Sequence, residues 1–152
     1  MDAINLTGKR VLITQADTFM GPTLCAVFAE LGAEVIADDR PLTEPAWPQA
    51  LVAASGSIDA LVANLAIPAP TTAATEVDDD EWRQAFAHLV DPLPRLARAV
   101  LPQMLARGSG SILVMGSASA LRGMKRASTY SAARGAQLAY VQALGTEVAP
   151  RG

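Results

Sequence analysis

The sequence predicts a doubly wound α/β fold, in which a parallel sheet carries helices on both faces. Short apolar runs rich in β-branched residues alternate along the chain with longer, alanine-rich stretches that have helical spacing. Turn-forming residues separate the two kinds of segment. Strands that alternate with helices in this way pair in parallel and bury both faces of their sheet. No linker or repeat divides the chain, so residues 1–152 are expected to form a single domain.

Each element is bounded by local signals. Pro22 is tolerated in the first turn of a helix, and Asp80 is a candidate cap for a helix that begins at Glu81. That helix is expected to continue, bent at Pro92, as far as Arg107. The expected strands are residues 10–14, 34–37, 58–63 and 111–115. The expected helices are residues 21–31, 47–55, 81–107 and 130–148, with loops over 67–80 and 116–128.

Composition excludes several classes of function. The 12 basic residues stand against 15 acidic ones, a net charge of −3, which disfavours a nucleic-acid-binding protein. Cys25 and His88 are each the single residue of their type, so no disulfide within the chain and no metal site built from such ligands is expected. No apolar run is long enough to cross a bilayer. These observations favour a cytoplasmic protein that acts without a metal.

The first turn, residues 14–21, lies where a dinucleotide fold places glycines that let the backbone approach a pyrophosphate. Only Gly21 is kept, because Gln15 and Phe19 stand where the other two glycines would be. Asp38 ends the second strand, where NAD-dependent enzymes hold the adenosine ribose. Two interpretations follow: a dinucleotide site with altered contacts, or a lost site in which Phe19 lines a different pocket.

Three further residues could together remove the proton from a substrate hydroxyl group. Ser117 follows the fourth strand, at the sheet edge where ligands bind in open α/β folds. Tyr130 and Arg134 are four residues apart on the last helix and therefore share a face. A permanent positive charge one turn away favours the tyrosine phenolate, which is a base, and a serine hydroxyl can hold the substrate oxygen.

These residues resemble two related families. A serine after this strand, followed by Tyr-xxx-Lys on the next helix, is typical of short-chain dehydrogenases/reductases, but here the lysine position holds arginine. A phenylalanine in the glycine turn together with an arginine in the triad resembles the halohydrin dehalogenases, which are cofactor-independent relatives of those enzymes. Two patterns carry this resemblance, Thr-x4-Phe-x-Gly and Ser-x12-Tyr-x3-Arg. Their matching residues are Thr14, Phe19 and Gly21, and Ser117, Tyr130 and Arg134.

The resemblance implies a Rossmann-like fold and a lyase that needs no nucleotide cofactor. Such an enzyme converts vicinal halohydrins to epoxides and halide, and in reverse opens epoxides with small anions. Ser117, Tyr130 and Arg134 would be its catalytic residues, and Phe19 would line the halide and substrate pocket. The resemblance also implies a homotetramer, and a further βαβ portion after residue 152 whose first strand pairs beside 111–115. By this expectation the domain is incomplete at its C-terminus.

Two alternatives remain open. One is an NAD(P)-dependent short-chain oxidoreductase with a degenerate glycine motif, which nicotinamide binding would support. The other is a non-catalytic family member that keeps the fold for assembly. Release of halide from a short halohydrin would distinguish the lyase from both.

Overall fold

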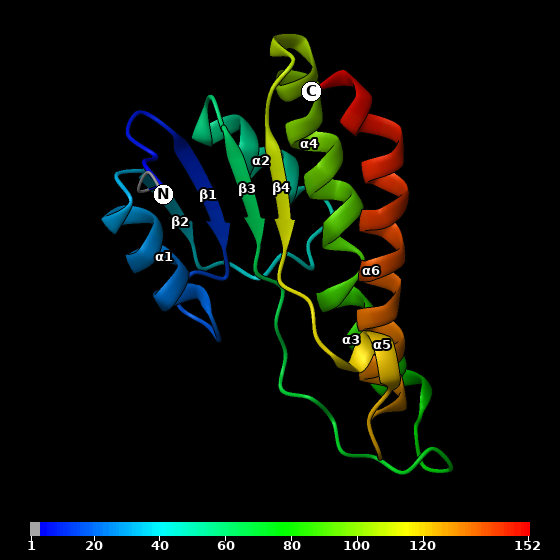
Figure 1. The fold of residues 1–152 in the computed structure, drawn as a ribbon. Coiled ribbons are helices and arrows are strands. Elements are labelled where there is room, and N and C mark those ends of the chain that lie inside the picture. Colours follow the sequence, from blue (N-terminus) through cyan, green and yellow to red (C-terminus); the bar gives the residue numbers. More distant parts are fainter. Residues whose placement is uncertain (1–3) are drawn as a thin grey trace.

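The computed structural model describes residues 4–152 as a parallel sheet with helices on both faces (Figure 1). This confirms the predicted fold class; residues 1–3 of the expected domain lie outside the described residues. Among residues 4–152, no helix has the length and apolar content to cross a membrane. The sheet order is β2-β1-β3-β4, with every neighbouring pair parallel. Its strands are β1 (Arg10–Thr14), β2 (Glu34–Asp38), β3 (Ala60–Ala63) and β4 (Ser111–Val114).

The two faces of the sheet bury alternate residues of each strand. Val11 and Ile13 pack on the side of α1, whereas Leu12 belongs to the larger core beneath α2, α4 and α6 (Figure 1). This is the period-two alternation that a strand imposes on its side chains. The helices are α1 (Gly21–Glu30), α2 (Trp47–Ser55), α3 (Asp79–Leu89), α4 (Pro92–Arg107), α5 (Ser119–Arg122) and α6 (Ser128–Val148), followed by the short 3₁₀ helix η1 (Ala149–Arg151).

The third predicted helix is wrong in its start and in its continuity. Asp78, not Asp80, is the N-cap, because its Oδ1 accepts from the Glu81 N–H at 2.7 Å. The chain then forms two helices, α3 and α4, with a break at Val90 and Asp91. Pro92 has no N–H to donate and its ring crowds the preceding turn, so the helix ends instead of bending.

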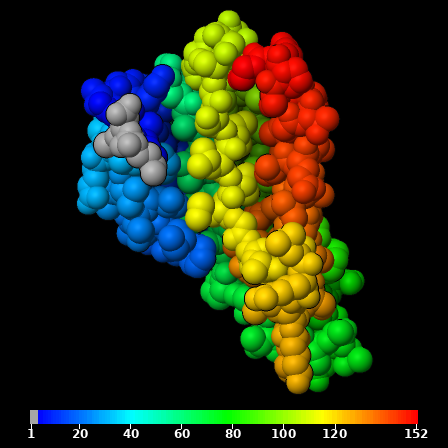
Figure 2. All heavy atoms as spheres, in the orientation of Figure 1, coloured from blue at the N-terminus to red at the C-terminus, as the bar shows by residue number. Residues whose placement is uncertain are grey.

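The region after β4 also differs from the expectation of a continuous loop. Residues 119–122 form the short helix α5, and Gly123, with φ of 65°, ends it. Within the described residues, β4 pairs only with β3, and the yellow residues of β4 lie at the surface in the view of Figure 2. Leu113 on β4 is 43% exposed. β4 is therefore an edge strand of the sheet described here, as β2 is at the opposite end.

The sheet topology predicts where a ligand binds. From β1 the chain passes to β2 on one side, and from β3 it passes to β4 on the other, so the order reverses between β1 and β3. In open α/β sheets, ligands bind at the carboxyl ends of the strands beside such a reversal. The turns after Thr14 and after Ala63 meet at this crevice.

Candidate functional site

The crevice between β1 and β3 is bridged by the side chain of Gln15. Its Oε1 accepts from the Ala66 N–H at 2.6 Å, and its Nε2 donates to the Ala66 carbonyl at 3.4 Å. The backbone of Gln15 has φ of 45°, the left-handed conformation that a glycine adopts easily. The turn thus keeps a glycine-like backbone shape, while a carboxamide crosses the space that glycine would leave open.

Asn64 holds the same turn from the end of β3. It is fully buried, and its Nδ2 donates to the carbonyls of Gln15 and Thr18, both at 2.9 Å. Gly21 is required here for close packing, because a Cβ at this position would lie 2.4 Å from the Gln15 carbonyl oxygen. The turn is therefore fixed by contacts within the protein.

Phe19 stands apart from the catalytic candidates in the described residues. Its backbone is left-handed, with φ of 55°, and its side chain is 65% exposed. It does not line the cavity beside Ser117 and Arg134. The placement of Phe19 in a halide pocket stays a prediction.

The Asp38 carboxylate, at the end of β2, is already paired with Arg40. Asp38 is 6% exposed, its Oδ1 accepts from the Arg40 N–H at 3.0 Å, and its Oδ2 accepts from Nε and Nη2 of Arg40 at 2.8 and 2.6 Å. The Arg40 guanidinium also lies 3.3 Å from the centroid of the Trp47 ring. An adenosine ribose would have to displace this ion pair. Together with the bridge of Gln15, this arrangement does not fit a bound dinucleotide.

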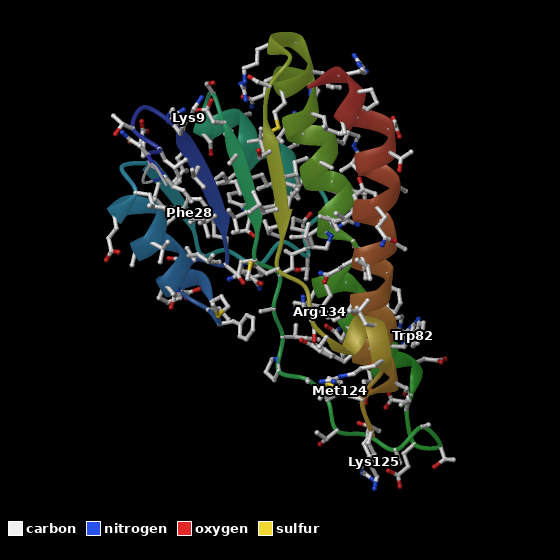
Figure 3. The ribbon with its side chains drawn as sticks, viewed as in Figure 1. Lys9, Phe28, Trp82, Met124, Lys125 and Arg134 are labelled. Carbon is white, nitrogen blue, oxygen red and sulfur yellow. The ribbon has the colours of Figure 1, made fainter. Side chains whose placement is uncertain are left out.

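The residues of the predicted triad come from two segments: Tyr130 and Arg134 lie on α6, and Ser117 lies in the segment that leaves β4. The guanidinium carbon of Arg134 lies 5.0 Å from the centroid of the Tyr130 ring. Arg134 and Ser117 line a common cavity of about 170 Å³, and Arg134 lies near the point where the chain leaves β4 (Figure 3). The Tyr130 side chain is 9% exposed, and its hydroxyl makes no hydrogen bond to residues 4–152. Tyr130 does not line the cavity that Arg134 and Ser117 share, so the joint placement of all three around a substrate stays a prediction.

Ser119, which the sequence did not single out as a site residue, orients Ser117. It is 2% exposed, and its Oγ donates to the Ser117 Oγ at 2.9 Å. The Ser119 N–H also donates to the Ser117 Oγ, at 3.2 Å. Because Ser117 accepts both bonds, its own O–H remains free to donate to a substrate oxygen.

Arg134 is buried without a carboxylate partner. It is 2% exposed, and its Nη1 donates to the Met115 carbonyl and to the Gln137 Oε1, both at 2.9 Å. No acidic residue within 4–152 forms a salt bridge with it, and its Nε is buried without a hydrogen-bond partner. Within the described residues, no ion pair therefore offsets its positive charge.

Gln137 is the site-associated residue that sequence reasoning missed. It follows Arg134 by three residues on α6 and is 1% exposed. The signal in the sequence was a polar residue on the buried face of a helix.

The described residues hold no group of three or more histidine, cysteine, aspartate or glutamate side chains placed to bind a metal.

Comparisons with known proteins identify the family to which the chain belongs. Residues 39–152 match the family model described as short chain dehydrogenase. A 2-keto-3-deoxy-L-fuconate dehydrogenase of Xanthomonas campestris pv. campestris is 32% identical over 97% of this chain, which spans 56% of that protein. Galactitol 2-dehydrogenase (L-tagatose-forming) of Cereibacter sphaeroides is 31% identical over 97% of this chain and 68% of its own length.

The solved structures that are similar to this chain include an oxidoreductase and an enzyme of a different activity. One described as a dehalogenation enzyme is 29% identical, with a TM-score of 0.89 over 96% of this chain and 69% of that chain. A gluconate 5-dehydrogenase from Burkholderia cenocepacia J2315, in complex with NADP and tartrate, is 25% identical, with a TM-score of 0.90 over 98% of this chain and 69% of that chain. Most of the relatives named here are oxidoreductases.

Proposed function

The chain belongs to the short-chain dehydrogenase family. From this, we propose that the protein uses the family's catalytic positions in a reaction that needs no nucleotide cofactor. The proposed reaction is the conversion of a vicinal halohydrin to an epoxide and halide. The observation that carries this proposal is the Gln15 side chain, which bridges the β1–β3 crevice by bonding to Ala66. The dehalogenation enzyme among the structural relatives supports it.

The reaction follows from the chemistry of the three side chains. Tyr130, as the phenolate, takes the proton from the substrate hydroxyl, and Ser117 donates a hydrogen bond to the same oxygen. Arg134 stabilises the phenolate with a charge that it cannot lose. The substrate oxygen then attacks the neighbouring carbon, the carbon–halogen bond breaks, and halide leaves with the bonding electron pair. The proton stays on Tyr130 until solvent removes it.

The reverse reaction defines the other ligands of the protein. A small anion attacks the less hindered carbon of an epoxide, and Tyr130 returns the proton to the opening oxygen. Halides and other small anions would thus be both products and nucleophiles. Phe19 is proposed to line the pocket that receives them.

A second candidate is an NAD(P)-dependent oxidoreductase, which the names of most relatives favour. Curated relatives of this chain include reductases and dehydrogenases that are 26–32% identical to it. For this chemistry the carboxamide of Gln15 would have to leave Ala66, and Arg40 would have to release Asp38. A non-catalytic family member is a third candidate, for which buried Arg134 would serve packing alone.

Two measurements made on the same preparation separate these candidates. Halide release from short vicinal chlorohydrins and bromohydrins is measured with no nucleotide added, alongside calorimetric titration with NADH and NADPH. Halide release without nucleotide binding supports the lyase. Nucleotide binding at micromolar affinity with no halide release would replace it with the oxidoreductase. If the protein neither releases halide nor binds a nucleotide, the non-catalytic role is the candidate that remains.

A further inference from the structure

Gln137 lies on the buried face of α6, directly behind the triad. Its Oε1 accepts from Nη1 of Arg134 at 2.9 Å, and its Nε2 donates to the Leu89 carbonyl at 2.5 Å. Both ends of the carboxamide are therefore engaged. The oxygen must face Arg134 because the nitrogen faces a carbonyl, which can only accept.

The Leu89 carbonyl depends on this donor because the helix breaks there. In a continuous helix the Leu93 N–H would donate to Leu89, but here it donates to the Val90 carbonyl at 3.0 Å. Leu89 is fully buried, so its carbonyl cannot turn to water instead. The break between α3 and α4 thus creates the acceptor that anchors Gln137.

A neutral acceptor has a specific consequence for Arg134. The two groups that accept from its guanidinium, the carboxamide of Gln137 and the carbonyl of Met115, carry no net charge. They fix its position without cancelling its charge. A glutamate at position 137 would form a charge-assisted pair with the guanidinium and offset that charge at short range.

We propose that Gln137 is the positioning residue for Arg134. Anchored on Leu89, it holds the guanidinium beside the Tyr130 ring and preserves its positive charge for the phenolate. The catalytic part of this inference rests on the proposed halohydrin chemistry. The positioning itself does not, and it can be measured separately.

Two substitutions of Gln137 separate position from charge. Gln137→Met removes both hydrogen bonds. Gln137→Glu loses the donor to the Leu89 carbonyl, but it keeps an oxygen acceptor for Arg134 at the same length and adds a negative charge that can hold the guanidinium by itself. The matched control is Gln103→Met on α4. Gln103 also makes two backbone hydrogen bonds, accepting from the Ile58 N–H at 2.8 Å and donating to the Gly56 carbonyl at 3.3 Å, and neither bond involves a triad residue.

The first measurement needs no substrate. Solvent exchange of the Arg134 N–H at Nε, followed by NMR and assigned with an Arg134→Lys variant, reports how firmly the guanidinium is held. We expect exchange to quicken about tenfold or more in Gln137→Met, and to stay slow in Gln137→Glu and in Gln103→Met. Unchanged exchange in Gln137→Met would overturn the positioning role, even if the protein released no halide.

The second measurement is kcat for halide release at neutral pH. We expect a loss of about tenfold or more in both Gln137 variants and an unchanged kcat in Gln103→Met. A purely structural role predicts that Gln137→Glu, with its guanidinium still held, keeps the wild-type kcat, and that result would refute the charge argument. Absence of halide release from the wild-type protein would count against the proposed function and leave the exchange measurement to decide the positioning role.

Discussion

The guanidinium of Arg134 faces the ring of Tyr130, with its carbon 5.0 Å from the ring centroid. The two residues are four apart on α6, so the helix itself brings them to one face. Arg134 is held there by Met115 and Gln137 and forms no salt bridge with an acidic residue of the described part of the chain. A buried, uncancelled charge beside a tyrosine is a costly arrangement, and a phenolate is the group that would offset its cost.

Tyr130→Phe should abolish halide release while the protein stays folded. The substitution removes the proposed base but keeps the buried ring, and the hydroxyl makes no hydrogen bond to residues 4–152 that would be lost. We expect a change in unfolding free energy below about 1 kcal/mol. Tyr140→Phe, on the same helix, is the control and should remain active. Substantial turnover by Tyr130→Phe would mean that another group acts as the base.

Glycine at the two unusual turn positions should affect stability differently, with the larger loss at Gln15. Phe19 is left-handed and 65% exposed, so Phe19→Gly relieves backbone strain and loses little packing. Gln15→Gly relieves similar strain but loses the hydrogen bonds to Ala66. We expect urea denaturation to show Phe19→Gly within about 1 kcal/mol of wild type or more stable, and Gln15→Gly less stable by about 1–2 kcal/mol. The reverse order would contradict the bridge that Gln15 is inferred to make.

Arg40→Ala should destabilise the protein more than its own exposure suggests. Asp38, its partner, is buried and would keep only a backbone N–H donor. We expect urea denaturation to show a free energy of unfolding that is lower by about 1–2 kcal/mol. The expected loss is no larger because the Arg40 side chain is 52% exposed, so solvent screens the ion pair. Arg83→Ala is the matched control, because the Arg83–Asp80 pair is exposed on both sides and should contribute almost nothing. Equal effects of the two substitutions would argue that Asp38 does not depend on Arg40.

Tyr140 should ionise at a higher pH than an ordinary tyrosine. Burial raises the pKa of Tyr140, the charge of Glu147 raises it further, and Arg98 partly opposes both. The chain has two tyrosines, so Tyr140 can be titrated alone, by phenolate absorbance, in the Tyr130→Phe variant. We expect a midpoint above about pH 10, lower in Glu147→Gln and higher in Arg98→Gln. A midpoint unmoved by either substitution would show that these charges do not reach the phenol.

The protein should be a homotetramer. We expect the helices α3, α4 and α6 to form its interfaces, and the outer surface of α3 carries Trp82, 45% exposed and stacked on Phe86 at 4.6 Å between ring centroids. Sedimentation at micromolar concentration measures the assembly. Trp82→Glu should weaken it, whereas Leu121→Glu, which changes another exposed apolar residue, should not. A monomeric wild-type protein would contradict this prediction.

Much of the fold follows from local sequence patterns. The strand at Arg10–Thr14 and the helix at Trp47–Ser55 lie where periodicity and turn residues place them, because both depend on neighbours within the segment. The spacing of Tyr130 and Arg134 also sufficed to place them together, since one helix carries both. The amino-acid sequence therefore determined the fold class and two members of the candidate triad.

Tertiary structure decided what required contacts between distant segments. The sequence shows that Gln15 is not glycine, but not that its carboxamide reaches Ala66 across the crevice. It shows Asp38 at a strand end, but not that Arg40 uses its oxygens. The role of Gln137 depends on Leu89, a carbonyl 48 residues away that is left without a donor only when α3 and α4 separate. Such groups are selected by the need to pair buried polar atoms, and that need exists only once the chain has folded.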